Sequence, residues 1–108
     1  MAIHQEQALG GWHQRSLVDQ SANVGSEVGR MRKWYGRNSE LCERAFLRAL
    51  DLLDLTIADS RWTGRRKELT RARTLLCDAM MQRGKQYGST LEDLDRYFLA
   101  FAVAARRS

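Results

Sequence analysis

The cations in residues 61–73 are the residues with the clearest chemical character. This segment holds six basic residues and a single acidic one, so its net charge of +5 equals that of the whole chain. The planar guanidinium group of arginine can donate two hydrogen bonds to the oxygens of one phosphate. Clustered cations also attract nucleic acids independently of the nucleotide sequence. The segment therefore predicts a surface that binds RNA, DNA or another acidic partner. Its basic residues are Arg61, Arg65, Arg66, Lys67, Arg71 and Arg73.

A second basic group lies beside aromatic residues. Arg32, Lys33 and Arg37 surround Trp34 and Tyr35, and Trp62 lies within the first group. Exposed aromatic rings stack on the bases of single strands, so these rings could contribute to binding. Aromatic rings are also common in helix cores and interfaces. Both interpretations are open from the sequence.

Acidic residues before the first basic group offer a different interpretation of its charge. Cations in the first turns of a helix oppose the helix dipole, so another interaction should compensate for them. Asp51, Asp54 and Asp59 could pair with the arginines across a tight turn. The compensation then comes either from these carboxylates or from the phosphates of a partner.

Catalytic and metal-binding patterns are missing from the sequence. His4 and His13 lie near the N-terminus without a neighbouring base or nucleophile to work with. Cys42 and Cys77 fall in predicted helices without the short spacing of metal ligands, which is typical of buried, reduced thiols. We therefore expect no enzymatic activity, no cofactor and no metal ion.

Four amphipathic helices are predicted to position these residues. Apolar residues recur at steps of three and four over residues 16–35, 39–58 and 63–83. Asn38 or Ser39 can cap the second helix, and Gly36 and Gly84 can end the first and the third. Residues 89–92, Ser-Thr-Leu-Glu, have the capping-box pattern and predict the start of the fourth helix.

The length and composition fit one folded domain. The chain has 108 residues, 44% of them hydrophobic and 29% charged, and it contains no proline. Short connections favour an antiparallel four-helix bundle, so we predict an all-α fold over residues 16–108 with a flexible N-terminal arm over residues 1–15. No stretch is apolar enough to span a membrane and no secretory signal is evident, so we expect a cytoplasmic protein that does not bind membranes.

Small residues line one face of the first predicted helix. Ser21, Gly25 and Gly29 lie four residues apart, which allows the backbone of another helix to approach closely. We predict a helix–helix interface here. It could support an oligomer or a complex with another protein.

Three blocks of sequence resemble a known group. Residues 22–28 (ANVGSEV), 48–59 (RALDLLDLTIAD) and 67–73 (KELTRAR) resemble short uncharacterised prokaryotic all-helical proteins. The resemblance spans about residues 17–107 and implies no activity. In architecture the chain is also similar to S23-like four-helix bundles, which associate as ring oligomers and in some cases bind nucleic acid together with a reverse transcriptase.

These observations favour a non-enzymatic accessory or adaptor protein. We expect it to bind nucleic acid or another acidic partner through the basic helix face. One alternative is an oligomeric protein–protein interaction module. Another is a helical antitoxin-like partner of a nucleotidyltransferase.

Overall fold

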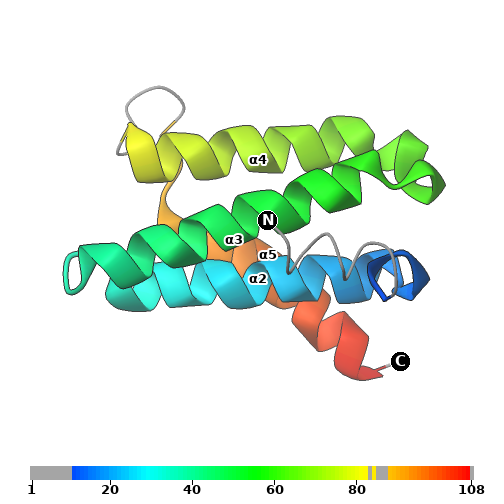
Figure 1. Cartoon of the computed structure of the whole chain (residues 1–108), viewed down its shortest axis with the longest axis horizontal. Helices are drawn as coiled ribbons and strands as arrows, with labels where there is room; N and C mark the ends of the chain where they lie inside the picture. Colours follow the sequence, from blue (N-terminus) through cyan, green and yellow to red (C-terminus); the bar gives the residue numbers. More distant parts are fainter. Residues whose placement is uncertain (1–10, 83, 85–87, 108) are drawn as a thin grey trace.

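The protein is an all-α four-helix bundle, as predicted (Figure 1). The computed structural model describes residues 11–82, 84 and 88–107. Its main helices are α2 (Leu17–Trp34), α3 (Ser39–Ala58), α4 (Arg66–Met81) and α5 (Leu91–Arg107), with 3-10 turns η1 (Trp12–Gln14) and η2 (Ser60–Arg65). Within this part of the chain no helix is both long and apolar enough to cross a membrane.

The helices pack around α2 and α3. These two run side by side in opposite directions, α4 lies along the outer side of α3, and α5 packs against α2 and contacts α4 less (Figure 1). The side chains of Val28, Met31, Leu53, Leu76 and Phe98 are almost completely buried between them. Each helix thus contributes its apolar stripe to one shared core.

Polar caps and glycine set the first two helix boundaries. The Ser16 hydroxyl accepts the Asp19 amide at the start of α2, and the Asn38 side chain accepts the Leu41 amide at the start of α3. Gly36 has a φ of 76°, a left-handed conformation that glycine adopts without strain. These boundaries agree with the sequence patterns.

The third predicted helix begins later than expected. Residues 60–65 form the separate turn η2, and α4 starts only at Arg66. Asp59 is the reason, because its carboxylate accepts the Arg61 amide and starts a short turn, while Trp62 (φ −108°, ψ 25°) leaves helical geometry. The helix ends at Met81, and its predicted end at residue 83 lies outside the described residues.

The start of α5 depends on Thr90 instead of the Ser89 expected from the capping box. The Thr90 hydroxyl accepts the Asp93 amide. Ser89 turns inward, and its hydroxyl lies 2.9 Å from the Leu75 carbonyl and 2.6 Å from a carboxylate oxygen of the buried Asp78. A polar bond to α4 therefore fixes the entry into α5.

The last residues of the predicted N-terminal arm, 11–15, belong to the folded domain. Residues 1–10 lie outside the described residues, but residues 11–15 fold onto the bundle and the Trp12 side chain is fully buried. Burying an indole removes a large apolar surface from water. This favourable contribution explains why residues near Trp12 belong to the domain.

Candidate nucleic-acid interface

The basic segment begins at a buried carboxylate. Asp59 is only 4% exposed and forms a bidentate ion pair with the Arg61 guanidinium, through both carboxylate oxygens and with a shortest distance of 2.6 Å. The hydrogen bond from Arg61 holds the pKa of Asp59 well below its usual range, with a smaller contribution from Gln20. Arg61 therefore neutralises an internal charge and is not available as a free cation.

Further hydrogen bonds make this pair part of a network. The Gln20 amide nitrogen donates to Asp59 (3.1 Å) and to the Trp12 carbonyl (2.9 Å), and its oxygen accepts the Trp62 indole N–H (3.0 Å). The Arg61 guanidinium also lies over the Trp62 ring, 4.5 Å from its centre. We call Asp59, Arg61, Gln20 and Trp62 the Asp59 anchor. It binds the turn before α4 to α2 and to the N-terminal segment.

Two more arginines of the segment are paired with the chain's own carboxylates. Arg65 pairs with Glu68 one turn later on the exposed face. Arg73 pairs with Asp54 of α3 at 2.7 Å, which raises the pKa of the Arg73 guanidinium. The prediction of local pairing therefore holds for Arg61 and Arg73, whose partners come from the end of α3 or directly after it.

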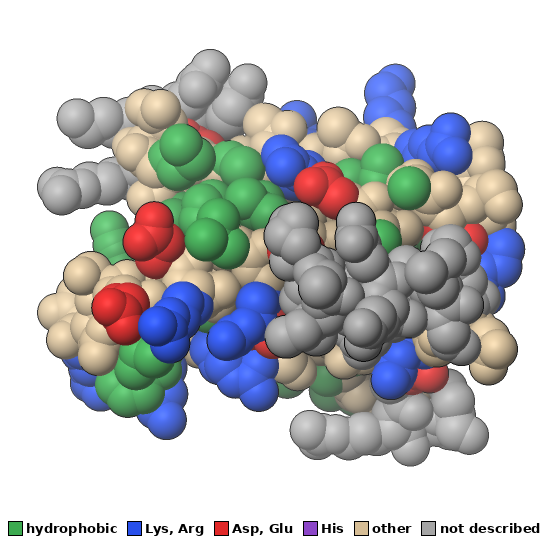
Figure 2. Space-filling view, viewed as in Figure 1, with side chains coloured by type: hydrophobic (Ala, Val, Ile, Leu, Met, Phe, Trp, Pro, Cys, Tyr) green, Lys and Arg blue, Asp and Glu red, His purple; other side chains and the backbone are tan. Residues whose placement is uncertain are grey.

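The remaining three cations differ from these. Arg66, Lys67 and Arg71 are exposed and form no ion pair within the described part of the chain. Arg66 does donate one hydrogen bond to the Ile57 carbonyl. Together with Thr70 and Thr74 they line one surface hollow on the outer side of α4, and we call these five residues the α4 ridge. Figure 2 shows Lys and Arg side chains projecting at this edge of the molecule.

The second basic group lies at the other end of the bundle. Arg32, Lys33 and Arg37 are near the α2–α3 connection, whereas α4 begins at the opposite end (Figure 1). Arg32 pairs with Asp95 of α5 at 3.1 Å, and the Lys33 ammonium lies 5.0 Å from the centre of the Trp34 ring. The structure therefore does not join the two predicted basic groups into one surface.

The aromatic residues proposed for base stacking have other contacts. Trp62 is half-buried in the Asp59 anchor, and Trp34 packs against the core. Tyr35 is exposed, at the end of α2 and away from the α4 ridge. None of the three lines the hollow that the unpaired cations share.

The small-residue face of α2 is covered by α5 of the same chain. A side chain at Gly25 would place its Cβ 2.8 Å from the Cβ of Phe98, and Ser21 is 2% exposed. At Gly29 the nearest group is the Asp95 carboxylate. This face is thus a helix–helix contact within the bundle. A large residue at position 25 would disturb the packing of α5 on α2, so such a variant cannot test oligomer formation separately from folding.

The histidines, cysteines and carboxylates were the other candidates for chemistry. No cluster of three or more His, Cys, Asp or Glu side chains suited to a metal ion occurs among the described residues. Cys42 is buried, which raises the pKa of its thiol, and Cys77 is half-buried. His4 and the side chain of His13 lie outside the described parts.

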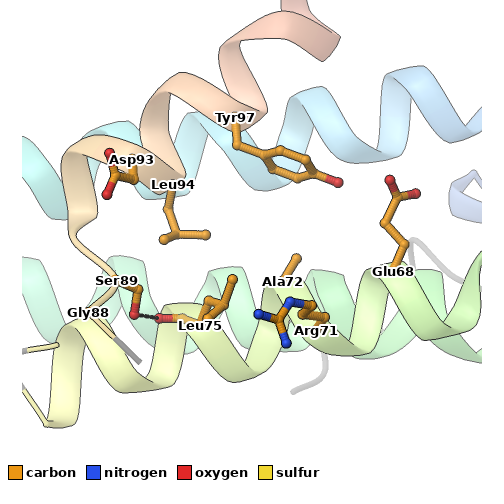
Figure 3. A pocket seen from close by; sticks show the side chains of 9 residues that line it. All are labelled: Glu68, Arg71, Ala72, Leu75, Gly88, Ser89, Asp93, Leu94 and Tyr97. Carbon is orange, nitrogen blue, oxygen red and sulfur yellow. Dashed lines mark hydrogen bonds between the residues drawn. The ribbon is translucent and has the colours of Figure 1, made fainter. Parts of the chain in front are cut away.

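A groove between α4 and α5 has no counterpart in the sequence analysis. It encloses about 420 Å³, with Ala72 and Leu75 on the α4 side and Leu94 and Tyr97 on the α5 side. Figure 3 shows the Tyr97 ring reaching from α5 towards Glu68 on α4. Residues so distant in the chain meet only through the packing of helices, and Tyr97 has no local pattern that marks it. We call this cavity the α4–α5 groove.

Known proteins offer no guide to the role of these surfaces. No protein-family model, curated protein or solved structure matches the chain. Its function has to be inferred from its own residues.

Proposed function

We propose that the protein is a non-enzymatic accessory protein that binds nucleic acid through the α4 ridge. One observation carries the proposal: three neighbouring cations share one surface hollow and have no carboxylate partner among the described residues. Of the six candidate cations in residues 61–73, Arg66, Lys67 and Arg71 are those that form no ion pair among the described residues, which supports their assignment to a partner's phosphates.

Phosphate is the chemistry that suits these residues. Two guanidinium groups and one ammonium provide charged donors, and the hydroxyl of Thr70 adds a neutral donor beside them. The Thr74 hydroxyl donates to the Thr70 carbonyl at 3.0 Å and so lines the hollow without serving as a donor. The cations also begin in the first turn of α4, where the helix dipole disfavours positive charge by about 0.3 to 1 kcal/mol each. A bound polyanion compensates for this unfavourable placement.

The test is binding to labelled RNA and DNA over a salt series. Neutralising the ridge in the triple variant Arg66→Gln, Lys67→Gln, Arg71→Gln should abolish measurable binding at moderate salt. At low salt, the slope of log affinity against log salt should fall by about 2 for a single strand, because each lost phosphate contact removes about 0.7. Fluorescence anisotropy measures both quantities.

The second basic group supplies a matched control. The variant Arg32→Gln, Lys33→Gln, Arg37→Gln removes the same number of charges from the opposite end of the bundle. We expect it to keep most of the affinity and most of the salt slope. Equal losses in both variants mean that binding follows net charge alone, and the assignment to α4 is then wrong.

A second candidate function is self-association through α5. Leu99 and Val103 are 56% and 39% exposed, and they lie four residues apart on one side of this helix. The last turns of α5 extend clear of α2 in Figure 1. Apolar side chains grouped in this way are typical of interaction surfaces. Light scattering should give more than a monomer for the native chain and a monomer for Leu99→Lys with Val103→Lys.

A further inference from the structure

The α4 ridge and the α4–α5 groove are adjoining parts of one surface. Arg71 and Leu75 line both the hollow on the outer side of α4 and the groove. A ligand whose charged part lies against the ridge can therefore place a neighbouring part in the groove without crossing another element.

The two parts differ in chemistry. The groove walls are mainly apolar, formed by Ala72, Leu75, Leu94 and the partly exposed ring of Tyr97. Two carboxylates, Glu68 and Asp93, also line it. These negative charges disfavour a phosphate inside the groove, whereas the cations of the ridge favour one outside it. The arrangement suits a ligand with an anionic chain and a neutral, flat, apolar side group.

Tyr97 is held in place at the groove. Its ring makes edge-on contacts with Phe98 and Phe101, at 5.0 and 5.4 Å between ring centres. Burial raises the pKa of Tyr97, and the negative charge of Glu68 raises it further, since both favour the neutral phenol. A positioned aromatic ring loses little conformational freedom when another ring stacks on it.

We propose that the α4–α5 groove receives an unpaired base of a single-stranded nucleic acid whose phosphates lie on the α4 ridge. The cavity of about 420 Å³ is within the range of small-molecule sites, so it has room for a base. This inference deepens the proposed function and rests on it. It specifies single strands, because the bases of a duplex are stacked on their neighbours and cannot enter a side groove without being flipped out.

The experiment compares three probes that carry similar backbones. They are a short single-stranded DNA, its blunt duplex, and the same single strand made with abasic sites. We expect the intact strand to bind roughly tenfold more tightly than the abasic strand, since a base stacked on an aromatic ring contributes on this scale. The duplex should also bind more weakly than the intact strand at the same salt.

Variants at Tyr97 locate the effect. Tyr97→Ala should remove most of the preference for the intact strand over the abasic one, whereas Tyr97→Phe should keep it because the ring is retained. If Tyr97→Ala fails to fold, Tyr97→Leu provides a second variant, since it removes the aromatic ring and preserves apolar volume. It should remove the same preference.

The outcomes separate the two proposals. If all three probes bind equally and still require the ridge cations, the base-binding groove is wrong and phosphate binding by the ridge stands. If none of the probes binds at low salt, both proposals fail. A preference for the intact strand that survives both Tyr97→Ala and Tyr97→Leu also overturns the proposed binding of a base in the groove.

Discussion

The Asp59 anchor and the α4 ridge are close in sequence and use the same residue types in opposite ways. In the anchor, Arg61 faces a carboxylate that is 4% exposed, stacks on Trp62 and donates to the Arg15 carbonyl. On the ridge, Arg66 and Arg71 are exposed and face no carboxylate among the described residues. Arginine stabilises the fold in the first case and is available to a partner in the second.

The difference teaches that local charge density does not define a binding surface. What matters is which cations have their charge balanced by the chain itself. A buried carboxylate needs its cation, because leaving such a charge unpaired is strongly destabilising. An exposed cation without an ion-pair partner contributes little to stability, so it can be replaced with little effect on the fold.

The largest expected effect concerns Trp12, whose carbonyl accepts a hydrogen bond from Gln20 of the Asp59 anchor. Trp12→Ala should lower the free energy of unfolding by about 3–5 kcal/mol, because it leaves a cavity where a fully buried indole packs. Trp12→Phe should cost much less. The Trp12 indole N–H has no hydrogen-bond partner in the described structure, so phenylalanine leaves no bond unmade. Urea denaturation measures both variants, and a neutral Trp12→Ala contradicts the assignment of residues 11–15 to the domain.

The next effect compares two aspartates that both pair with arginine. Asp59→Ala should destabilise the protein by about 2–3 kcal/mol, since it removes a helix-type cap and charged hydrogen bonds in a buried place. Asp54→Ala removes the exposed pair with Arg73 and should cost less than about 1 kcal/mol. Thermal unfolding of the two variants side by side is the measurement. Equal losses would falsify the distinction between anchored and exposed pairs.

Acid should weaken the anchor selectively. The pKa of Asp59 is lower in the folded chain than in the unfolded chain, so the folded state binds fewer protons there. Its contribution is complete at neutral pH and is lost as the pH falls below about 4, the ordinary range of aspartate. Asp59→Asn should therefore lose less stability than the native chain over this range, by on the order of 1 kcal/mol. Urea midpoints measured from neutral pH downwards test this, and identical slopes contradict it.

The smallest effect has the opposite sign. Lys67→Glu should stabilise the protein by about 0.3 to 1 kcal/mol, because an acidic residue in the first turn of α4 suits the helix dipole. The same change should weaken nucleic-acid binding. Thr70→Ser serves as a control that alters the ridge without altering its charge. A destabilised Lys67→Glu variant would show that the ridge contributes to the fold.

The sequence was sufficient for features that depend on local patterns. Ser16, Asn38 and Gly36 act within one turn of their own positions, so the first two helices could be predicted closely. The start of α4 could not be predicted in this way, because the sequence alone does not show which of several nearby arginines pairs with Asp59. In the structure this carboxylate also accepts a hydrogen bond from Gln20, a residue 39 positions earlier in the chain, which no local pattern reveals.

The candidate site was only partly predictable for the same reason. The six cations are plain in the sequence, but their division into paired and unpaired sets depends on tertiary contacts such as that between Arg73 and Asp54. Trp12 gave no periodic signal because it precedes the first helix. Tyr97 gave none because its importance comes from the neighbouring helix.

The close contact between Gly25 and Phe98 sets how near α5 lies to α2. α5 is seated directly on the backbone of α2 at this point, and a single added carbon would meet Phe98 at 2.8 Å. Substitution of this glycine would push α5 away from α2 and so change the spacing between Leu94 and Leu75 on its other side. We therefore expect substitution of this remote glycine to alter ligand binding in the α4–α5 groove, and mutational scans should include it.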